Sequence, residues 1–144
     1  YILADIAPYV DFWSVGSNDL TQYLLAVDRN NHRVAGLYDP YHPSVVRVLQ
    51  LIIQQAGQQG KPVSICGELA GDPVGVLILL AMGYRSFSMN LNNISRIKYI
   101  MRRICLADLP PLLETGLRQG CSAGLREQFS RYLQQRGLGD LLPA

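Results

Sequence analysis

The sequence has little of several features that would assign a protein to a class at once. Its 144 residues include only three cysteines and two histidines, and without a Cys-x-x-Cys pair they indicate neither a disulfide framework nor a zinc site. The net charge is only +2, and the one adjacent basic pair is "RR" at 102–103. We therefore expect no nucleic-acid partner, because such proteins carry clustered lysine and arginine.

Long hydrophobic runs are also missing. The longest apolar stretch, "VLILLAM" at 76–82, is far shorter than the roughly 20 residues that cross a bilayer. The opening "YILADIAPYVDF" has no basic start of the kind that begins a signal peptide. The sequence begins without methionine, and we expect its first residues to lie inside a secondary-structure element. We expect a cytoplasmic protein with reduced thiols and no membrane partner.

The composition is that of globular material, with 49% hydrophobic and 17% charged residues. Short β-rich runs alternate with stretches of helical spacing. We predict strands at 11–16, 60–68 and 85–90, and a loop at 28–43. We predict helices ending near residue 9 and over 18–28, 44–58, 72–83, 93–105, 107–118 and 122–136.

This alternation predicts an α/β fold with a parallel sheet. Three parallel strands make a poor domain by themselves, because both faces of the sheet need cover and its edges can pair with other chains. The pattern favours the C-terminal part, about the last three β/α units, of a (β/α)₈ TIM barrel.

Polar residues follow the first predicted strand, in "SVGSNDLTQYLLAVDR" at 14–29. The carboxylate of Asp19 suits Mg²⁺, the amide of Asn18 can bind a phosphate oxygen, and Arg29 can bind an anion through two hydrogen bonds. Capping of the following helix by Asn18 and Asp19 explains the same residues without a ligand. The residues taken alone leave both interpretations open.

The second strand ends in Cys66, Gly67 and Glu68. A buried cysteine there is commonly an inert small hydrophobe, but a thiol that is mostly protonated near pH 7 can also donate a proton. Gly67 permits close approach of a ligand to the backbone. Glu68 lies on the same side of the strand as Cys66 if the strand geometry persists.

The remaining chemistry-bearing residues have plain structural interpretations. Five aromatic residues are expected to pack in the core or the loops: Trp13, Tyr23, Tyr38, Tyr41 and Phe87. His32 and His42 are expected to be solvated in the predicted loop, and Cys105 and Cys121 to be structural.

Two long motifs carry a family resemblance. "SVGSNDLTQYLLAVDR" with "SICGELAGDP" resembles the C-terminal, phosphoenolpyruvate-binding barrel of the PEP-utilising enzymes, most closely the enzyme I branch of the phosphotransferase system or its nitrogen-related paralogue. "SFSMN" at 86–90 resembles the last barrel strand. The resemblance covers residues 1–104 as barrel and leaves 105–144 as terminal helices that pack on it.

The resemblance implies a role for each matching residue. Asp19 would bind Mg²⁺, and Asn18, Arg29 and Gly67 would bind phosphoenolpyruvate. Cys66 would protonate the enolate to give pyruvate, supported by Glu68. The implied activity moves the phosphoryl group from phosphoenolpyruvate to a histidine of the enzyme and then to a histidine phosphocarrier protein. Family barrels pair, so a homodimer is implied.

The sequence also departs from the family pattern. The upstream domain with the phosphorylated histidine is missing, as are the first barrel strands with their arginines and second metal carboxylate. Trp13 stands where a smaller apolar residue is usual. We expect the chain alone to be catalytically inactive. The alternatives are the pyruvate phosphate dikinase and PEP synthase branch, or a non-catalytic module that senses phosphoenolpyruvate or dimerises.

Overall fold

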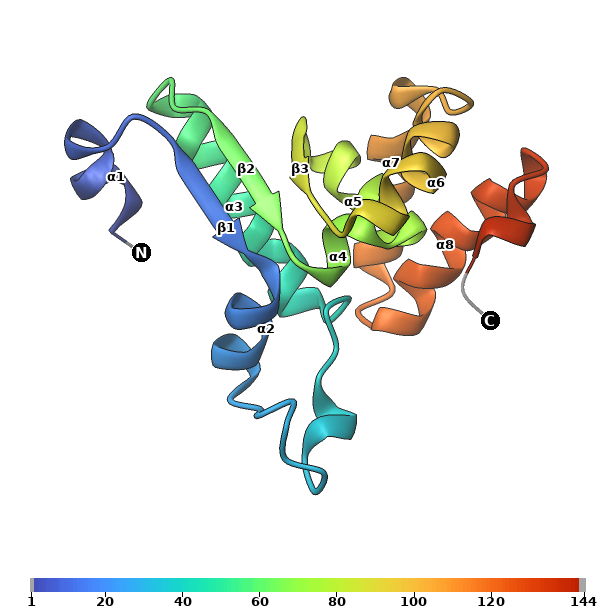
Figure 1. Ribbon diagram of the computed structural model, residues 1–144, viewed down its shortest axis with the longest axis horizontal. Helices are drawn as coiled ribbons and strands as arrows, with labels where there is room; N and C mark the ends of the chain where they lie inside the picture. Colours follow the sequence, from blue (N-terminus) through green and yellow to red (C-terminus); the bar gives the residue numbers. More distant parts are fainter. Residues whose placement is uncertain (1, 143–144) are drawn as a thin grey trace.

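A small parallel sheet organises the structure, a computed structural model that describes residues 2–142 (Figure 1). Its three strands are β1 (Trp13–Gly16), β2 (Val63–Cys66) and β3 (Ser86–Ser88), in the order β1-β2-β3. Gly16 pairs with Cys66, and Cys66 with Ser88, so the carboxyl ends of all three strands lie at one edge of the sheet. The predicted parallel α/β fold is confirmed, with strands shorter than predicted.

Helices connect and follow the strands. The α-helices are α1 (Leu3–Ile6), α2 (Ser17–Leu25), α3 (Pro43–Gln58), α4 (Glu68–Gly71), α5 (Pro73–Met82), α6 (Leu91–Met101), α7 (Leu109–Arg118) and α8 (Ser122–Gln135). Short 3₁₀ turns are η1 (Ala7–Tyr9), η2 (Ala35–Leu37), η3 (Leu106–Asp108) and η4 (Gly139–Leu141). No helix within residues 2–142 has both the length and the apolar character needed to cross a bilayer.

The two faces of the sheet differ in chemistry. Alternate residues of a strand point to opposite faces, and the apolar set is buried in the core: Trp13, Val15, Val63 and Ile65. The alternate positions of the three strands carry serines in register, which we call the serine row: Ser14, Ser64 and Ser86. Ser14 and Ser86 are exposed. The hydrophobic core therefore lies on one side of the sheet.

Helix α5 is the centre of the helical layer. Residues 73–80 are all buried, as expected for a helix that is apolar on every side. Asp72 caps its first turn by accepting a hydrogen bond from the Gly75 N–H at 2.8 Å, and Gly83 ends it in the left-handed conformation. α5 packs against α4, α6, α7 and α8 (Figure 1).

Three local details differ from the prediction or add to it. The predicted 93–105 helix begins at Leu91, because the Asn90 side chain accepts the Asn92 N–H and caps it, and it ends at Met101. The predicted 28–43 loop contains η2 and projects from the body of the molecule (Figure 1). The one-turn helix α4 was not predicted, because its four residues are too few to show a period.

Replacing Tyr84 by phenylalanine should lower the free energy of unfolding by about 1 kcal/mol at neutral pH. The fully buried Tyr84 hydroxyl donates to the Leu49 carbonyl at 2.8 Å and joins the start of the third β/α unit to α3. Burial also raises the pKa of Tyr84 above its ordinary value of 10.0. The neutral phenol therefore stabilises the fold fully below pH 10, and this contribution is lost as the pH rises further. Urea unfolding from pH 7 to 11 should show the wild type losing its advantage over the variant. An advantage that is constant with pH would contradict this.

Candidate active site

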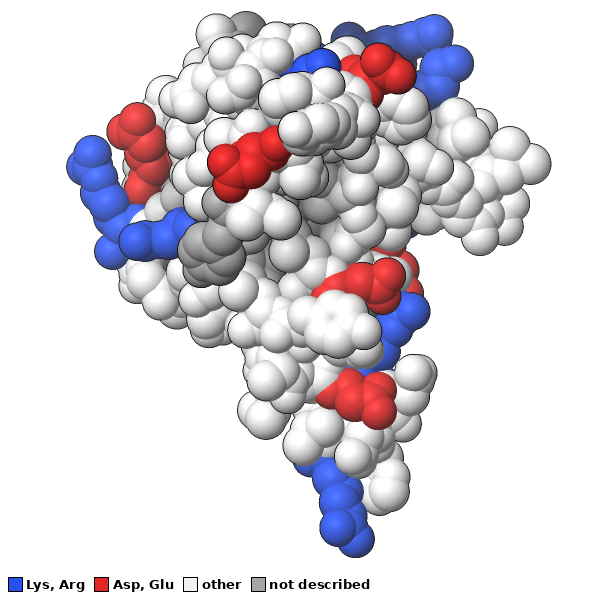
Figure 2. Space-filling model, turned by 90° about the vertical axis from the view of Figure 1, so that its left-hand side faces the viewer, with Lys and Arg blue, Asp and Glu red and all other residues white. Residues whose placement is uncertain are grey.

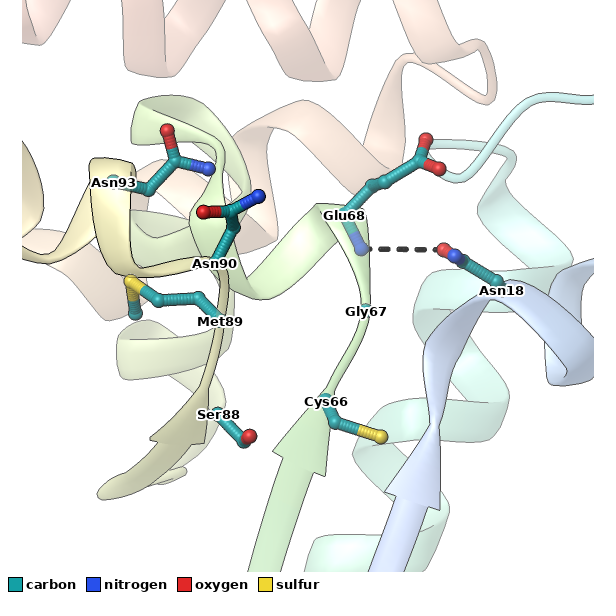
Figure 3. A pocket seen from close by; sticks show the side chains of 8 residues that line it. All are labelled: Asn18, Cys66, Gly67, Glu68, Ser88, Met89, Asn90 and Asn93. Atoms are coloured by element: carbon teal, nitrogen blue, oxygen red, sulfur yellow. Dashed lines mark hydrogen bonds between the residues drawn. The ribbon is translucent and has the colours of Figure 1, made fainter.

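A pocket of about 400 Å³ opens at the carboxyl ends of β2 and β3, next to the start of α2 (Figure 3). It lies where ligands bind in parallel α/β proteins. Eight residues line it: Asn18, Cys66, Gly67, Glu68, Ser88, Met89, Asn90 and Asn93. Three predicted strand ends thus contribute to one cavity. Cys66 is half-buried and lines this cavity, so it is not a buried core residue.

Two hydrogen bonds tie the first turn of α2 to the end of β2. The buried Ser17 hydroxyl donates to the Cys66 carbonyl at 2.8 Å, and the Glu68 N–H donates to the Asn18 side-chain oxygen at 3.2 Å (Figure 3). Gly16 is the N-cap of α2, and no side chain caps this helix. The capping interpretation of Asn18 and Asp19 is therefore wrong, and Asn18 instead joins two motifs that lie 50 residues apart.

Gly67 turns the chain sharply between β2 and α4. Its φ of 112° and ψ of −175° lie in a region that is essentially reserved for glycine. The strand geometry stops at Cys66, so the condition under which Glu68 would follow strand alternation is not met. Glu68 reaches the pocket because α4 begins there. A Cβ on Gly67 would lie 2.3 Å from the Ser17 hydroxyl oxygen, so only glycine fits this contact.

Asp19 and Arg29 lie near the pocket but do not line it. Successive helical residues point about 100° apart, so Asp19 faces solvent when its neighbour Asn18 faces the pocket. A guanidinium nitrogen of Arg29 lies 3.3 Å from a carboxylate oxygen of Glu68, and the two side chains are 40% and 79% exposed. Such an exposed ion pair contributes little to stability, so Arg29 can exchange this partner for a ligand at little cost.

The donor set fits Mg²⁺ only in part. Among residues 2–142, no group of three or more histidine, cysteine, aspartate and glutamate side chains is placed to hold a metal. Asp19 supplies one exposed carboxylate beside the pocket. Mg²⁺ commonly uses one or two carboxylates and completes its shell with water and substrate phosphate. Asp19 could therefore serve as one ligand, with the others coming from elsewhere.

Several other predictions also needed correction. Tyr23 is 80% exposed and does not pack. Cys105 and Cys121 are exposed free thiols and so have no packing role in the core. His42 is half-buried, and its Nδ1 accepts the Ser44 N–H at 3.2 Å at the start of α3.

Sequence reasoning assigned no role in the site to three residues that build it. Ser17 lies inside the quoted motif, where its small hydroxyl beside a glycine was the available signal. Tyr38 lies in the projecting loop, where no local pattern distinguishes it. Its hydroxyl donates to the Asn18 side-chain oxygen at 3.4 Å. Asn93, at the start of α6, completes the pocket wall.

The fold and the site define a parallel α/β protein with a ligand pocket at its strand ends. The sequence model of the "PEP-utilising enzyme, PEP-binding domain" family matches residues 1–106. The chain belongs to this family, as its two motifs predicted.

Curated relatives agree with this assignment. The chain is 44% identical over 142 residues, 99% of its length, to a Salmonella typhimurium protein named "Phosphoenolpyruvate-dependent phosphotransferase system". It is 45% identical to the Escherichia coli protein of that name, also over 99% of its length. A "Phosphoenolpyruvate-protein phosphotransferase" from Haemophilus influenzae is 41% identical over 92% of the chain. The chain spans only 19%, 19% and 23% of these relatives, respectively.

Proposed function

We propose that this chain is the phosphoenolpyruvate-binding part of a phosphoenolpyruvate-protein phosphotransferase. The supporting observation is that the two family motifs meet at one pocket, where the Asn18 oxygen accepts the Glu68 N–H and Cys66 lines the same cavity. The enzyme would move the phosphoryl group to one of its own histidines and then to a histidine phosphocarrier protein. Pyruvate would be released.

In this proposal, Asn18 and Arg29 bind the phosphate group of phosphoenolpyruvate. The Asn18 oxygen is occupied by the Glu68 N–H, which leaves its NH₂ group to donate to a phosphate oxygen. Arg29 would leave Glu68 and bind the phosphate through two parallel hydrogen bonds. Asp19 would hold Mg²⁺ together with ligands from outside this chain, and the ion would supply charge neutralisation when bound.

Cys66 is the proton donor in this proposal. The bond between phosphorus and the enol oxygen breaks, and phosphorus bonds to the acceptor histidine nitrogen. The resulting enolate takes the proton of the Cys66 thiol at its methylene carbon and becomes pyruvate, and the thiolate regains a proton from solvent. Glu68 supports this proton transfer from the rim of the pocket, and Gly67 lets the ligand approach the backbone.

The proposal extends to the whole protein. We infer that residues 1–104 form about the last three β/α units of a (β/α)₈ barrel, and that 105–144 are terminal helices on its outside. The exposed strand edges favour completion by further chain, and the partial coverage of the relatives agrees with this. A cytoplasmic homodimer is part of the same proposal.

In Figure 2 the charged side chains on one face are scattered, with no continuous patch of one sign.

The full-length protein that contains this chain should acquire acid-labile phosphate from ³²P-labelled phosphoenolpyruvate in the presence of Mg²⁺. Asp19→Asn should raise the Mg²⁺ concentration for half-maximal labelling by more than about tenfold, since even residues that only support a metal ligand change affinity by that factor. Asp5→Asn, on α1, is the matched control and should behave as wild type. Mg²⁺-dependent binding of phosphoenolpyruvate without any labelling would reject the transferase and indicate a sensing module.

A further inference from the structure

The loop between α2 and α3 projects from the molecule, yet its end is firmly held (Figure 1). The Tyr41 hydroxyl donates to the Asp72 carboxylate, whose same oxygen accepts the Gly75 N–H at the start of α5. The Tyr41 ring is only 5% exposed, and the Arg126 guanidinium from α8 lies 4.8 Å from its centre. The loop is thereby fastened to the buried helical layer.

Tyr38 lies three residues before this anchor and reaches the pocket wall. Its hydroxyl and the Glu68 N–H both face the side-chain oxygen of Asn18, at 3.4 and 3.2 Å. A backbone N–H can only donate, so the amide must present its oxygen to this side. With a second donor from Tyr38, both lone pairs of that oxygen are used.

The surroundings keep the Tyr38 phenol in its donating form. Burial raises the pKa of Tyr38 above 10.0. A hydrogen bond with Thr21 and the positive charge of Arg29 lower this pKa, and the negative charges of Glu68 and Asp19 raise it further. The net rise means that the hydroxyl carries its proton throughout the neutral range. Glu68, Arg29 and Asp19, whose charges affect this pKa, are the three charged residues that the sequence predicted for the site.

We propose that Tyr38 is a positioning residue, which fixes the Asn18 amide so that its NH₂ group faces an anionic ligand in the pocket. This inference rests on the proposed function, because Asn18 is taken as a phosphate ligand. A phenylalanine at position 38 keeps the ring and removes one of the two donors that orient the amide. The amide then rotates more freely and binds phosphate less well.

A double-mutant cycle in the full-length protein tests this. In phosphoenolpyruvate-dependent labelling, Tyr38→Phe should raise KM for phosphoenolpyruvate about fivefold, the factor that one net hydrogen bond is worth, with little change in kcat. In an Asn18→Ala background, the same substitution should have no further effect, because the group it orients is gone. Tyr23→Phe, an exposed tyrosine on α2, is the control and should leave KM unchanged.

The outcomes separate this inference from the function on which it rests. A wild-type protein that takes no phosphate from phosphoenolpyruvate would reject the proposed function, and the inference with it. Normal wild-type labelling with additive effects of the two substitutions would reject the role of Tyr38 alone. A lower melting temperature of Tyr38→Phe with unchanged KM would also reject it, because that pattern belongs to a residue that only stabilises the loop.

Discussion

Cys66→Ala in the full-length protein should lower turnover of phosphoenolpyruvate by about 10²- to 10⁴-fold, the usual contribution of a positioned general acid. The thiol lines the pocket at the end of β2, and Glu68 and Asn18 line the same pocket (Figure 3). The substitution removes the proton donor and leaves the phosphate-binding groups intact. Affinity for phosphoenolpyruvate should therefore change much less than turnover.

Two measurements make this expectation specific to Cys66. Exchange of solvent deuterium into the methyl group of pyruvate requires the same proton donor, and it should disappear with turnover. Cys105→Ala removes an exposed free thiol elsewhere and should behave as wild type in both assays. Full exchange in Cys66→Ala would show that another group protonates the enolate.

Gly67→Ala should lower the free energy of unfolding by about 3 kcal/mol, because it combines backbone strain with a steric clash. The conformation at Gly67, with φ of 112° and ψ of −175°, excludes a side chain. The new Cβ would also lie 2.3 Å from the Ser17 hydroxyl oxygen and 3.0 Å from the Asn18 side-chain oxygen. The bonds that join α2 to β2 must then break, so binding of phosphoenolpyruvate should be lost as well.

Two other glycines with positive φ and open space around them serve as controls in urea unfolding of the full-length protein. Gly60 and Gly120 have φ of 63° and 69°, and a Cβ on either would meet nothing within 4 Å. Alanine at these positions should cost only about 1 kcal/mol, the price of a left-handed conformation, and leave binding unchanged. An equal loss of stability at all three positions would mean that neither the greater backbone strain at Gly67 nor its contact with Ser17 contributes.

The meeting of the two motifs could be predicted from sequence, because parallel strands bring their carboxyl ends to one edge. Gly16 and Cys66 are register partners, and this pairing brings Asn18 to Glu68. The glycines after the β-rich runs marked where the strands end. The local sequence pattern was therefore sufficient to locate the strand ends. The parallel topology was sufficient to predict that these ends lie at one edge of the sheet.

The details of the site depend on geometry that the pattern does not encode. The direction of Glu68 follows from one unusual pair of backbone angles at Gly67. Asn18 and Asp19 are neighbours in sequence but diverge on the helix, so one motif supplies one pocket residue and one solvent-facing carboxylate. Tyr38 contacts Asn18 from 20 residues further along the chain, beyond α2 and the projecting loop, a contact that no short-range signal predicts.

The serine row makes one face of the sheet polar, so the hydrophobic effect favours packing of helices on the opposite, apolar face only. Burying a hydroxyl without a hydrogen-bond partner is unfavourable. Among the three serines of the row, only Ser64 donates a hydrogen bond to a described residue, the Trp13 carbonyl at 3.4 Å. Any segment that covers this face must therefore bring polar groups or trap ordered water. Covering the serine row would therefore gain little from the hydrophobic effect.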